Sequence, residues 1–181
     1  MKKIFVILFI FTLAGFTFGQ SKTDLGIQGN LAIPMGDFGE YYDLGYGGLL
    51  SFYFNISPGF ALGVNSGYQI WDATGLTNTS LSAIPVLGAF RYYFGVDKFK
   101  PYVLGSVGGY YTVTKYEYEL LGVKYSGSDS EFHPGFSAGI GFVYKVSPMV
   151  GIDFTGRFSN IFRTNDSNTF IDICAGALFC L

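Results

Sequence analysis

Charged residues are scarce in this sequence. Asp, Glu, Lys and Arg make up 13% of the 181 residues, about half of the share that is usual in soluble globular proteins. The formal net charge is −2 and no basic run occurs, which argues against a nucleic-acid-binding protein. Intrinsic disorder is also excluded, because 49% of the residues are apolar.

Residues that carry metal or nucleophilic chemistry are few. His133 is the only histidine, so a histidine-based metal cluster is excluded. Cys174 and Cys180 are six residues apart, which places them on one face of a strand and about 20 Å from each other. A disulfide needs Cα atoms within about 7 Å. We therefore expect two structural cysteines, no metal and no cofactor.

Long apolar runs are confined to the N-terminus. Beyond Gln20 no segment approaches the ~18 consecutive apolar residues of a membrane-spanning helix, and helical periodicity is absent. Lys2 and Lys3 precede the apolar run 4–16, and small residues follow at the −3 and −1 positions of a cleavage site before Gln20. This order is typical of a secretory signal peptide and not of a buried N-terminal helix.

We therefore expect residues 1–19 to be a cleaved signal peptide and residues 20–181 to form one exported domain. The residue directly after the predicted cleavage site is Gln20 and not a cysteine, which argues against a lipid-anchored protein. The mature chain has 9 basic and 13 acidic residues, so its net charge is near −4.

Alternation of large and small residues is abundant. In FALGVNSGYQIW (60–71), large apolar side chains alternate with small or amide residues, and a period of two predicts a β-strand with unlike faces. The pattern predicts strands at about 24–33, 45–55, 60–71, 83–94, 101–116, 132–145, 149–161 and 168–181. The connectors are short at 56–59, 95–98 and 146–148, and longer at 34–44, 72–82, 117–131 and 162–167.

The unlike faces indicate what surrounds the strands. In segment 132–145, Phe136, Ile140 and Phe142 share one face, while Ser137 and Gly139 share the other. The interior of an eight-stranded barrel is only just wide enough for its side chains, so the large residues belong outside. That exterior exposes on the order of a few thousand Å² of apolar surface, whereas a soluble monomer tolerates a few hundred. The sequence thus predicts an all-β, eight-stranded antiparallel up-and-down transmembrane β-barrel, not a soluble barrel of lipocalin type.

The connectors and the aromatic residues orient this barrel. Barrels of this class have tight periplasmic turns and longer outer loops, so we expect the Ser-Pro turns to face the periplasm. Aromatic residues near the strand ends predict a girdle at each membrane interface. The girdle residues are Phe54, Phe60, Tyr92 and Phe94, with Phe52 and Phe99, on the periplasmic side, and Tyr68, Trp71, Tyr110 and Phe162, with Tyr116, on the outer side.

Four charged residues fall on inward-facing positions of the predicted strands: Arg91, Asp153, Arg157 and Asp172. Because isolated charges are costly to bury, we expect ion pairs that plug the lumen, helped by inward amides. Arg157 and Asp172 lie opposite each other if the last hairpin turns near Asn165. A water-filled lumen is the alternative, because inward glycines remove bulk. The amides are Gln28, Asn30, Asn65 and Gln69, and the glycines are Gly63, Gly67, Gly139 and Gly141.

The segments GIQGNLAIPMGDFGEYYDLGYGG (26–48) and PYVLGSVGGYY (101–111) resemble barrel domains of Bacteroidetes outer-membrane proteins. The whole mature chain resembles the small outer-membrane β-barrel family that includes outer-membrane protein X, the Ail-type adhesins and the barrel of outer-membrane protein A. The resemblance implies a barrel assembled in the outer membrane, and no single activity. Such chains often end on an aromatic residue, whereas this one ends on Leu181, which shares a face with Phe179.

Some small barrels are lipid-modifying enzymes with a serine and a histidine near the outer rim. Here Ser137 follows His133 at four residues, about 13 Å along a strand, which is too far for a nucleophile and its base. We therefore expect that the protein is not an enzyme. The distant alternative is a lipid-modifying outer-membrane enzyme.

The predicted outer loops are acidic. Asp37, Glu40 and Asp43 give the first loop a charge of −3, and the segment 117–131 also sums to −3. Solvated loop charge is the ordinary interpretation; contact with cations that bridge lipopolysaccharide, or with a basic partner, is the alternative.

The predicted function is a non-enzymatic outer-membrane barrel that serves envelope structure, or adhesion and other surface contacts through its loops. The alternative is a porin-like channel for small solutes. The expected partners are membrane lipid, lipopolysaccharide and a surface ligand, with the chain as a monomer.

Overall fold

The computed structural model describes residues 23–75, 79–95, 98–120, 123–163 and 166–181. The predicted signal peptide, residues 1–19, lies outside these ranges. Among the described residues, no helix is both long enough and apolar enough to cross a membrane. The strands are β1 (Thr23–Met35), β2 (Gly45–Ser57), β3 (Phe60–Asp72), β4 (Ser80–Tyr93), β5 (Phe99–Leu120), β6 (Val123–Lys145), β7 (Val150–Phe162) and β8 (Ser167–Cys180), and a short helix, α2 (Asp37–Tyr41), follows β1.

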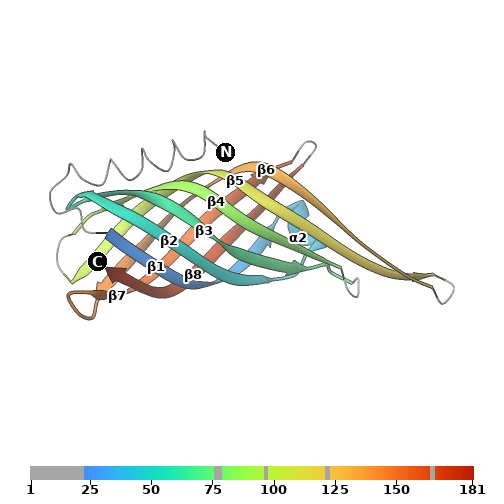
Figure 1. Ribbon diagram of the computed structural model, residues 1–181, viewed down its shortest axis with the longest axis horizontal. Helices are drawn as coiled ribbons and strands as arrows, with labels where there is room; N and C mark the ends of the chain where they lie inside the picture. Colours follow the sequence, from blue (N-terminus) through green and yellow to red (C-terminus); the bar gives the residue numbers. More distant parts are fainter. Residues whose placement is uncertain (1–22, 76–78, 96–97, 121–122, 164–165) are drawn as a thin grey trace, which may run out of the picture.

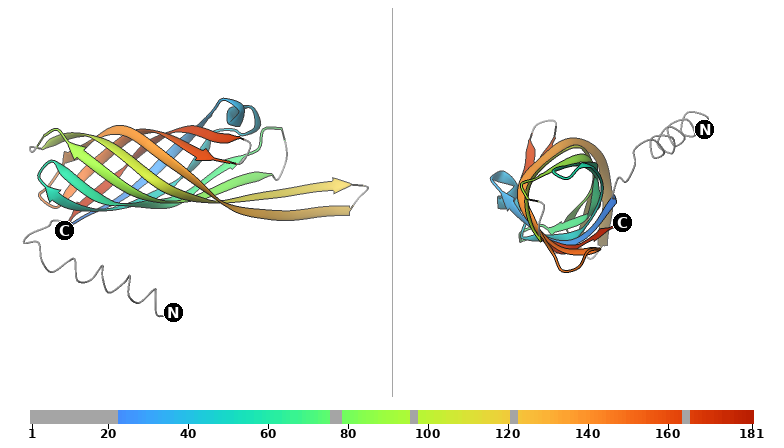
Figure 2. Two further views of the ribbon diagram at one scale, coloured as in Figure 1. Left: turned by 90° about the horizontal axis from the view of Figure 1, so that it is seen from above. Right: turned by 90° about the vertical axis from the view of Figure 1, so that its left-hand side faces the viewer.

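Each strand pairs antiparallel with its neighbours in the sequence, and β1 pairs with β8 to close the sheet into a barrel. The end-on view in Figure 2 shows the closed ring. Closure pairs the backbone groups along the wall, as strands in lipid require. The predicted eight-stranded up-and-down barrel is therefore confirmed.

The two ends of the barrel differ (Figure 1). One end, here called the turn end, carries the C-terminus and the short connections β2–β3 and β6–β7. In the second of these turns, Ser147 Oγ accepts hydrogen bonds from the backbone N–H groups of Met149 and Val150, at 3.3 and 3.0 Å. The opposite end, here called the loop end, carries α2 and the projecting part of the β5–β6 hairpin.

The β5–β6 hairpin is longer than the sequence predicted. Residues 117–120 and 123–131 do not form a loop, because β5 and β6 remain paired as far as Leu120 and Val123. The pairing of β4 with β5 ends at Lys115, and that of β6 with β7 begins at Gly135, so the hairpin projects beyond the barrel as a ribbon (Figure 2). The prediction was wrong because Gly, Ser and Asp in this segment have low strand propensity, and the pairing register set within the barrel overrides it.

The first loop also contains structure that the sequence analysis missed. The helix α2 begins after Gly36, whose φ of +59° favours glycine. Asp37 and Glu40 lie in its first turn, where negative charge is favourable. Phe38 is the buried residue of the helix.

Side chains alternate across the wall as predicted. On β7, Ile152 and Phe158 face outward, with 46% and 39% of their surface exposed, whereas Asp153 and Arg157 between them are buried. On β6, Ile140 is 69% exposed. An outer wall of large apolar side chains is the surface that a bilayer covers.

Candidate functional site

The four inward charges form two ion pairs. Arg91 Nη1 donates a hydrogen bond to Asp153 Oδ2 at 2.9 Å, and Arg157 Nε donates to Asp172 Oδ2 at 2.9 Å. Arg157 lies directly opposite Asp172 in the β7–β8 register, as the sequence suggested. Both carboxylates have no exposed surface, so they depend on protein groups for compensation of their charge.

The pair nearer the turn end is enclosed by tyrosines. The guanidinium carbon of Arg91 lies 4.4 Å from the ring centroid of Tyr53 and 4.5 Å from that of Tyr102, which are cation–π distances. Tyr102 donates its hydroxyl to Asp153 Oδ1 at 2.6 Å, and Tyr53 donates to Asn65 Oδ1 at 3.0 Å. Stacking and hydrogen bonding therefore fix this arginine in the lumen.

A glycine makes room for this arrangement. Gly141 on β6 lies opposite Tyr102 on β5, and a Cβ atom there would stand 2.6 Å from the Tyr102 hydroxyl. Tyr102 can therefore occupy its place in the lumen only because position 141 is a glycine.

The second pair is centred on Asp172. Its Oδ1 accepts hydrogen bonds from Asn30 Nδ2 at 2.8 Å and from Gln69 Nε2 at 2.6 Å. Its Oδ2 accepts from Arg157 and, at 3.1 Å, from the hydroxyl of Ser159. One carboxylate thus joins β1, β3, β7 and β8 across the lumen.

Little space remains between the two layers. Gln28 Nε2 donates to Thr155 Oγ1 at 3.2 Å beside them. A cavity of about 10 Å³, lined by Gln28, Asn65, Arg91 and Arg157 among others, lies there. That volume is enough for about one water molecule. The four amides named from the sequence all belong to these layers: Gln28, Asn30, Asn65 and Gln69.

An aromatic cluster closes the loop end of the lumen. Phe38 of α2 is 3% exposed, and its ring centroid lies 5.5 Å from that of Trp71 and 6.4 Å from that of Phe170. Trp71 Nε1 donates to the carbonyl oxygen of Ala32 at 3.3 Å. The helix therefore caps the barrel by inserting a phenylalanine.

The prediction of an outward-facing girdle is wrong for two residues. Trp71 is 0% and Tyr110 is 2% exposed, and both pack inside the barrel in the cluster that contains Phe38. Trp71 has the same strand parity as Gln69, so the alternation itself places it inward; its position near the strand end misled the prediction. Of the other girdle residues, Phe54, Tyr68, Tyr92, Phe94, Phe99, Tyr116 and Phe162 are exposed on the outside, and Phe52 and Phe60 are half-buried.

The acidic residues of the first loop are exposed at the loop end. These are Asp37, Glu40 and Asp43, and Asp43 Oδ1 accepts a hydrogen bond from the hydroxyl of Thr74 at 3.1 Å. Glu131 on β6 is also exposed, and its Oε2 lies 3.5 Å from Arg163 Nη2. The side chains of residues 117–125 lie outside the described part of the structure.

The residues considered for catalysis are not assembled. Ser137 Oγ shares a hydrogen bond of 2.6 Å with Ser106 Oγ. His133 Nε2 instead lies 3.0 Å from Glu131 Oε2, without hydrogen-bond geometry. Within the described ranges, no group of three His, Cys, Asp or Glu residues could hold a metal ion. Both cysteines are free thiols.

Several solved structures with the same fold are bacterial surface and outer-membrane proteins. The chain is similar to Neisserial surface protein A, with 17% identity, a TM-score of 0.64 and coverage of 88% of this chain and 97% of that chain. For a major outer membrane protein from Thermus thermophilus, the identity is 13%, the TM-score 0.60 and the coverage 88% of this chain and 99% of that chain.

A third similar structure is Ail, the attachment invasion locus protein of Yersinia pestis, in complex with the heparin analogue sucrose octasulfate. Its identity is 14%, its TM-score 0.56 and the coverage 89% of this chain and 97% of that chain. No known family's sequence pattern and no curated protein matches the chain. At these identities the likeness shows the fold, which is that of the small eight-stranded outer-membrane barrels.

Proposed function

We propose that the protein is a monomeric, exported outer-membrane β-barrel with a closed lumen, and that it acts through the surface at its loop end in envelope structure or adhesion. The observation that carries this proposal is the β5–β6 hairpin, which projects beyond the barrel (Figure 2), while two ion pairs and an aromatic cluster close the lumen. In this arrangement the turn end faces the periplasm and the loop end faces outward.

The closure of the lumen by paired charges favours a surface function over a solute channel. The two ion-pair layers and the aromatic cap succeed one another along the lumen, and the cavity between the ion pairs holds about 10 Å³. A solute would have to displace two buried ion pairs whose carboxylates have no exposed surface, at a large cost in free energy.

The hairpin offers a chemically defined contact surface. Residues 123–134 of β6 pair with β5, while the described pairing of β6 with β7 begins at Gly135. An edge of this kind presents backbone N–H and C=O groups to an extended segment of a partner. The projecting ribbon therefore suits recognition by strand addition.

The charge at the loop end favours cations over polyanions. Asp37, Glu40 and Asp43 are exposed there, and like charges repel a partner of the same sign. Ail was solved with a sulfated heparin analogue; the acidic first loop of this chain does not suit such a ligand. We infer contact with divalent cations that bridge lipopolysaccharide, or with a basic partner.

Location is tested by cell fractionation and gel migration. We expect the protein to fractionate with the outer membrane and to migrate differently on gels before and after boiling, because a closed barrel in lipid resists detergent. Recovery as a soluble periplasmic monomer without detergent would contradict the proposal.

The role of the hairpin is tested by shortening it. Tyr116 lies opposite Gly127, so residues 117–126 can be replaced by Asn-Gly, which forms a two-residue hairpin turn. We expect this variant to keep its heat-modifiable migration but to lose surface adhesion or envelope integrity. The variant D37N/E40Q/D43N serves as the charge control. It neutralises the acidic residues of the first loop and keeps the hairpin intact. Unchanged adhesion and envelope permeability in the shortened variant would refute a role for the hairpin.

A further inference from the structure

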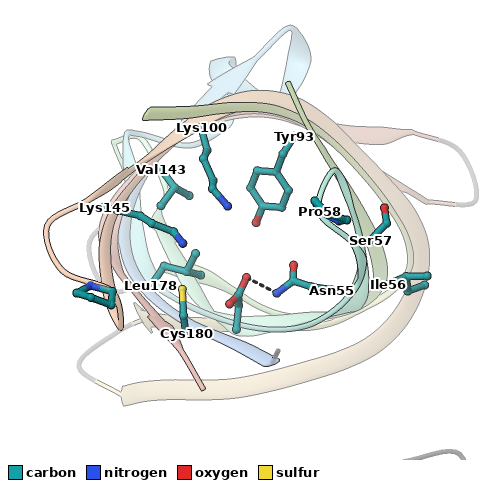
Figure 3. Close-up of a pocket in the computed structure, with 12 residues that line it drawn as sticks. Asn55, Ile56, Ser57, Pro58, Tyr93, Lys100, Val143, Lys145, Leu178 and Cys180 are labelled. Atoms are coloured by element: carbon teal, nitrogen blue, oxygen red, sulfur yellow. Dashed lines mark hydrogen bonds between the residues drawn. The ribbon is translucent and has the colours of Figure 1, made fainter. Parts of the chain in front are cut away.

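A cavity opens inside the barrel at the turn end (Figure 3). Its volume is about 460 Å³, within the ~300–1,000 Å³ that is usual for ligand sites. Its lining includes the polar residues Asp24, Asn55, Tyr93, Lys100, Lys145 and Cys180.

The cavity borders on packed side chains. Val143 and Leu178 line it, are 1% and 2% exposed, and belong to the buried cluster that contains Tyr53 and Tyr102. Since those tyrosines enclose Arg91, the cavity is a cup below the ion-pair layers and not the mouth of an open channel.

Two lysines direct positive charge into the cup. Lys100 on β5 lies opposite the inward-facing Val143, and Lys145 follows Val143 by two residues on β6. Figure 3 shows both ammonium groups pointing into the cavity, and Lys100 Nζ lies 5.8 Å from the ring centroid of Tyr93. In the part of the chain that the structure describes, no carboxylate forms an ion pair with either lysine. Asp24 is the one carboxylate among the described lining residues, so the two lysines leave a net positive charge in the cup. That net charge favours an anion between them.

Two buried polar atoms at the cup lack partners. The Tyr93 hydroxyl and Asp24 Oδ1 have no hydrogen bond in the described structure, although Tyr93 is 7% and Asp24 5% exposed. Figure 3 shows the Tyr93 hydroxyl directed into the cavity. The other oxygen of Asp24 accepts from Asn55 Nδ2 at 2.9 Å. Buried polar groups are normally satisfied, so these two atoms are available to hydrogen-bond with water or with a ligand that enters the cup.

We propose that this cup binds a small soluble anion with a carboxylate or phosphate group, held by Lys100, Lys145 and the Tyr93 hydroxyl. Asp24 Oδ1 accepts a hydrogen bond from a hydroxyl of the same ligand. Hydrogen phosphate, which has both negative charge and a hydroxyl, is therefore a suitable probe. Because the lysines lie on inward-facing positions, the site takes a free anion in preference to a phospholipid headgroup at the outer wall.

Cys180 provides a reporter in the site itself. It lines the cup and is half-buried, whereas Cys174 is 1% exposed, so Cys174→Ala leaves one accessible thiol. In detergent micelles we expect the anionic reagent sulfonatoethyl methanethiosulfonate to label Cys180 several-fold faster than its trimethylammonium analogue, relative to a free thiol, because the two lysines outnumber the single carboxylate of Asp24 in the cup. Lys100→Gln with Lys145→Gln should remove this preference.

Binding is tested by protection of the same thiol. Hydrogen phosphate at constant ionic strength should slow labelling of Cys180 by uncharged N-ethylmaleimide several-fold. Lys100→Gln with Lys145→Gln should abolish the protection, and Lys100→Arg with Lys145→Arg should retain it. Lys98→Gln is the matched control, because it removes an exposed charge at the same end from a residue outside the lining. Heat-modifiable migration verifies that each variant is folded.

Two outcomes would overturn the proposal. Equal rates with both charged reagents, together with no protection by phosphate, would show that the cup holds no anion. Protection in phosphate-free nanodiscs that contain phosphatidylglycerol but not in those of phosphatidylcholine, without protection by phosphate in micelles, would assign the lysines to a lipid headgroup.

Discussion

Arg157 and Asp172 lie directly opposite each other on β7 and β8, and the guanidinium Nε donates to the carboxylate at 2.9 Å. Asp172 has no exposed surface and accepts three further hydrogen bonds, from Asn30, Gln69 and Ser159. Uncharged donors satisfy its lone pairs, but Arg157 is the cation paired with it among the described residues. Asn30 is on β1, the strand that closes the barrel against β8, so the carboxylate of this pair also links the two strands of the closure.

Replacement of Arg157 by alanine should destabilise the barrel. We expect the free energy of unfolding to fall by about 3 kcal/mol, because the change leaves a buried carboxylate without its counter-charge. Urea unfolding in lipid vesicles measures the effect. Arg163→Ala is the control, since Arg163 is partly exposed and lies 3.5 Å from Glu131 at the loop end; exposed pairs contribute about 1 kcal/mol or less.

The partner substitution completes a double-mutant cycle. Arg157→Met with Asp172→Asn should recover part of the stability lost in the single variants, because it removes both charges together. Additive losses in the cycle would show that the two residues do not interact.

The fold and the two ion pairs can be predicted from short-range patterns in the sequence. A period of two assigns each residue to the inside or the outside, so Arg91, Asp153, Arg157 and Asp172 can be identified as inward-facing without a structure. The hairpin register then brings Arg157 to Asp172. Strand parity also places Tyr53 and Tyr102 on the inward face. There they are large residues among small ones, a pattern that marks them as candidates for the lumen.

Other features depend on contacts between distant segments. Phe38 enters the lumen because α2 folds back over the barrel, and nothing local in the first loop specifies that position. The cup at the turn end combines Asp24, Tyr93, Lys100 and Lys145 from four strands. Each residue alone resembles a solvated charge or an interfacial tyrosine, so only barrel closure shows that they share a cavity.

The closed lumen predicts that the protein does not conduct ions in planar bilayers. We expect little or no steady conductance from the purified wild type, because the paired charges and the aromatic cap leave no continuous water column. Conductance that persists after the hairpin is shortened, and that changes in size when Arg91 or Arg157 is shortened, would establish a channel.

Removal of the Phe38 ring should open the aromatic cap. Trp71 is the only tryptophan of the chain and has no exposed surface, so its fluorescence reports on the cap. We expect Phe38→Ala to increase quenching by acrylamide and to shift the emission to longer wavelength, because water then reaches the indole. Tyr41→Ala changes an exposed residue of the same helix and should leave both signals unchanged. An unaltered Trp71 signal in Phe38→Ala would show that the helix does not cover it.

The seating of α2 should also depend on pH. Tyr42 follows the helix, and its ring centroid lies 5.1 Å from that of Phe38. Burial raises the pKa of the Tyr42 hydroxyl above its ordinary value of 10, although the positive charge of Arg163 opposes this shift. A raised pKa in the state in which α2 packs over the lumen means that protonated Tyr42 favours this packing. The stabilisation is therefore fully present below about pH 10 and is lost as the pH rises through the raised pKa.

Acrylamide quenching of Trp71 across the alkaline range tests this dependence. We expect the quenching constant of the wild type to rise above about pH 10, as ionised Tyr42 leaves the buried site and the helix releases Phe38. Tyr42→Phe keeps the ring and removes the titrating hydroxyl, so its quenching should stay flat over the same range. The comparison also corrects for the other tyrosines, which are identical in both proteins. Parallel profiles for the two proteins would show that Tyr42 ionisation does not control the cap.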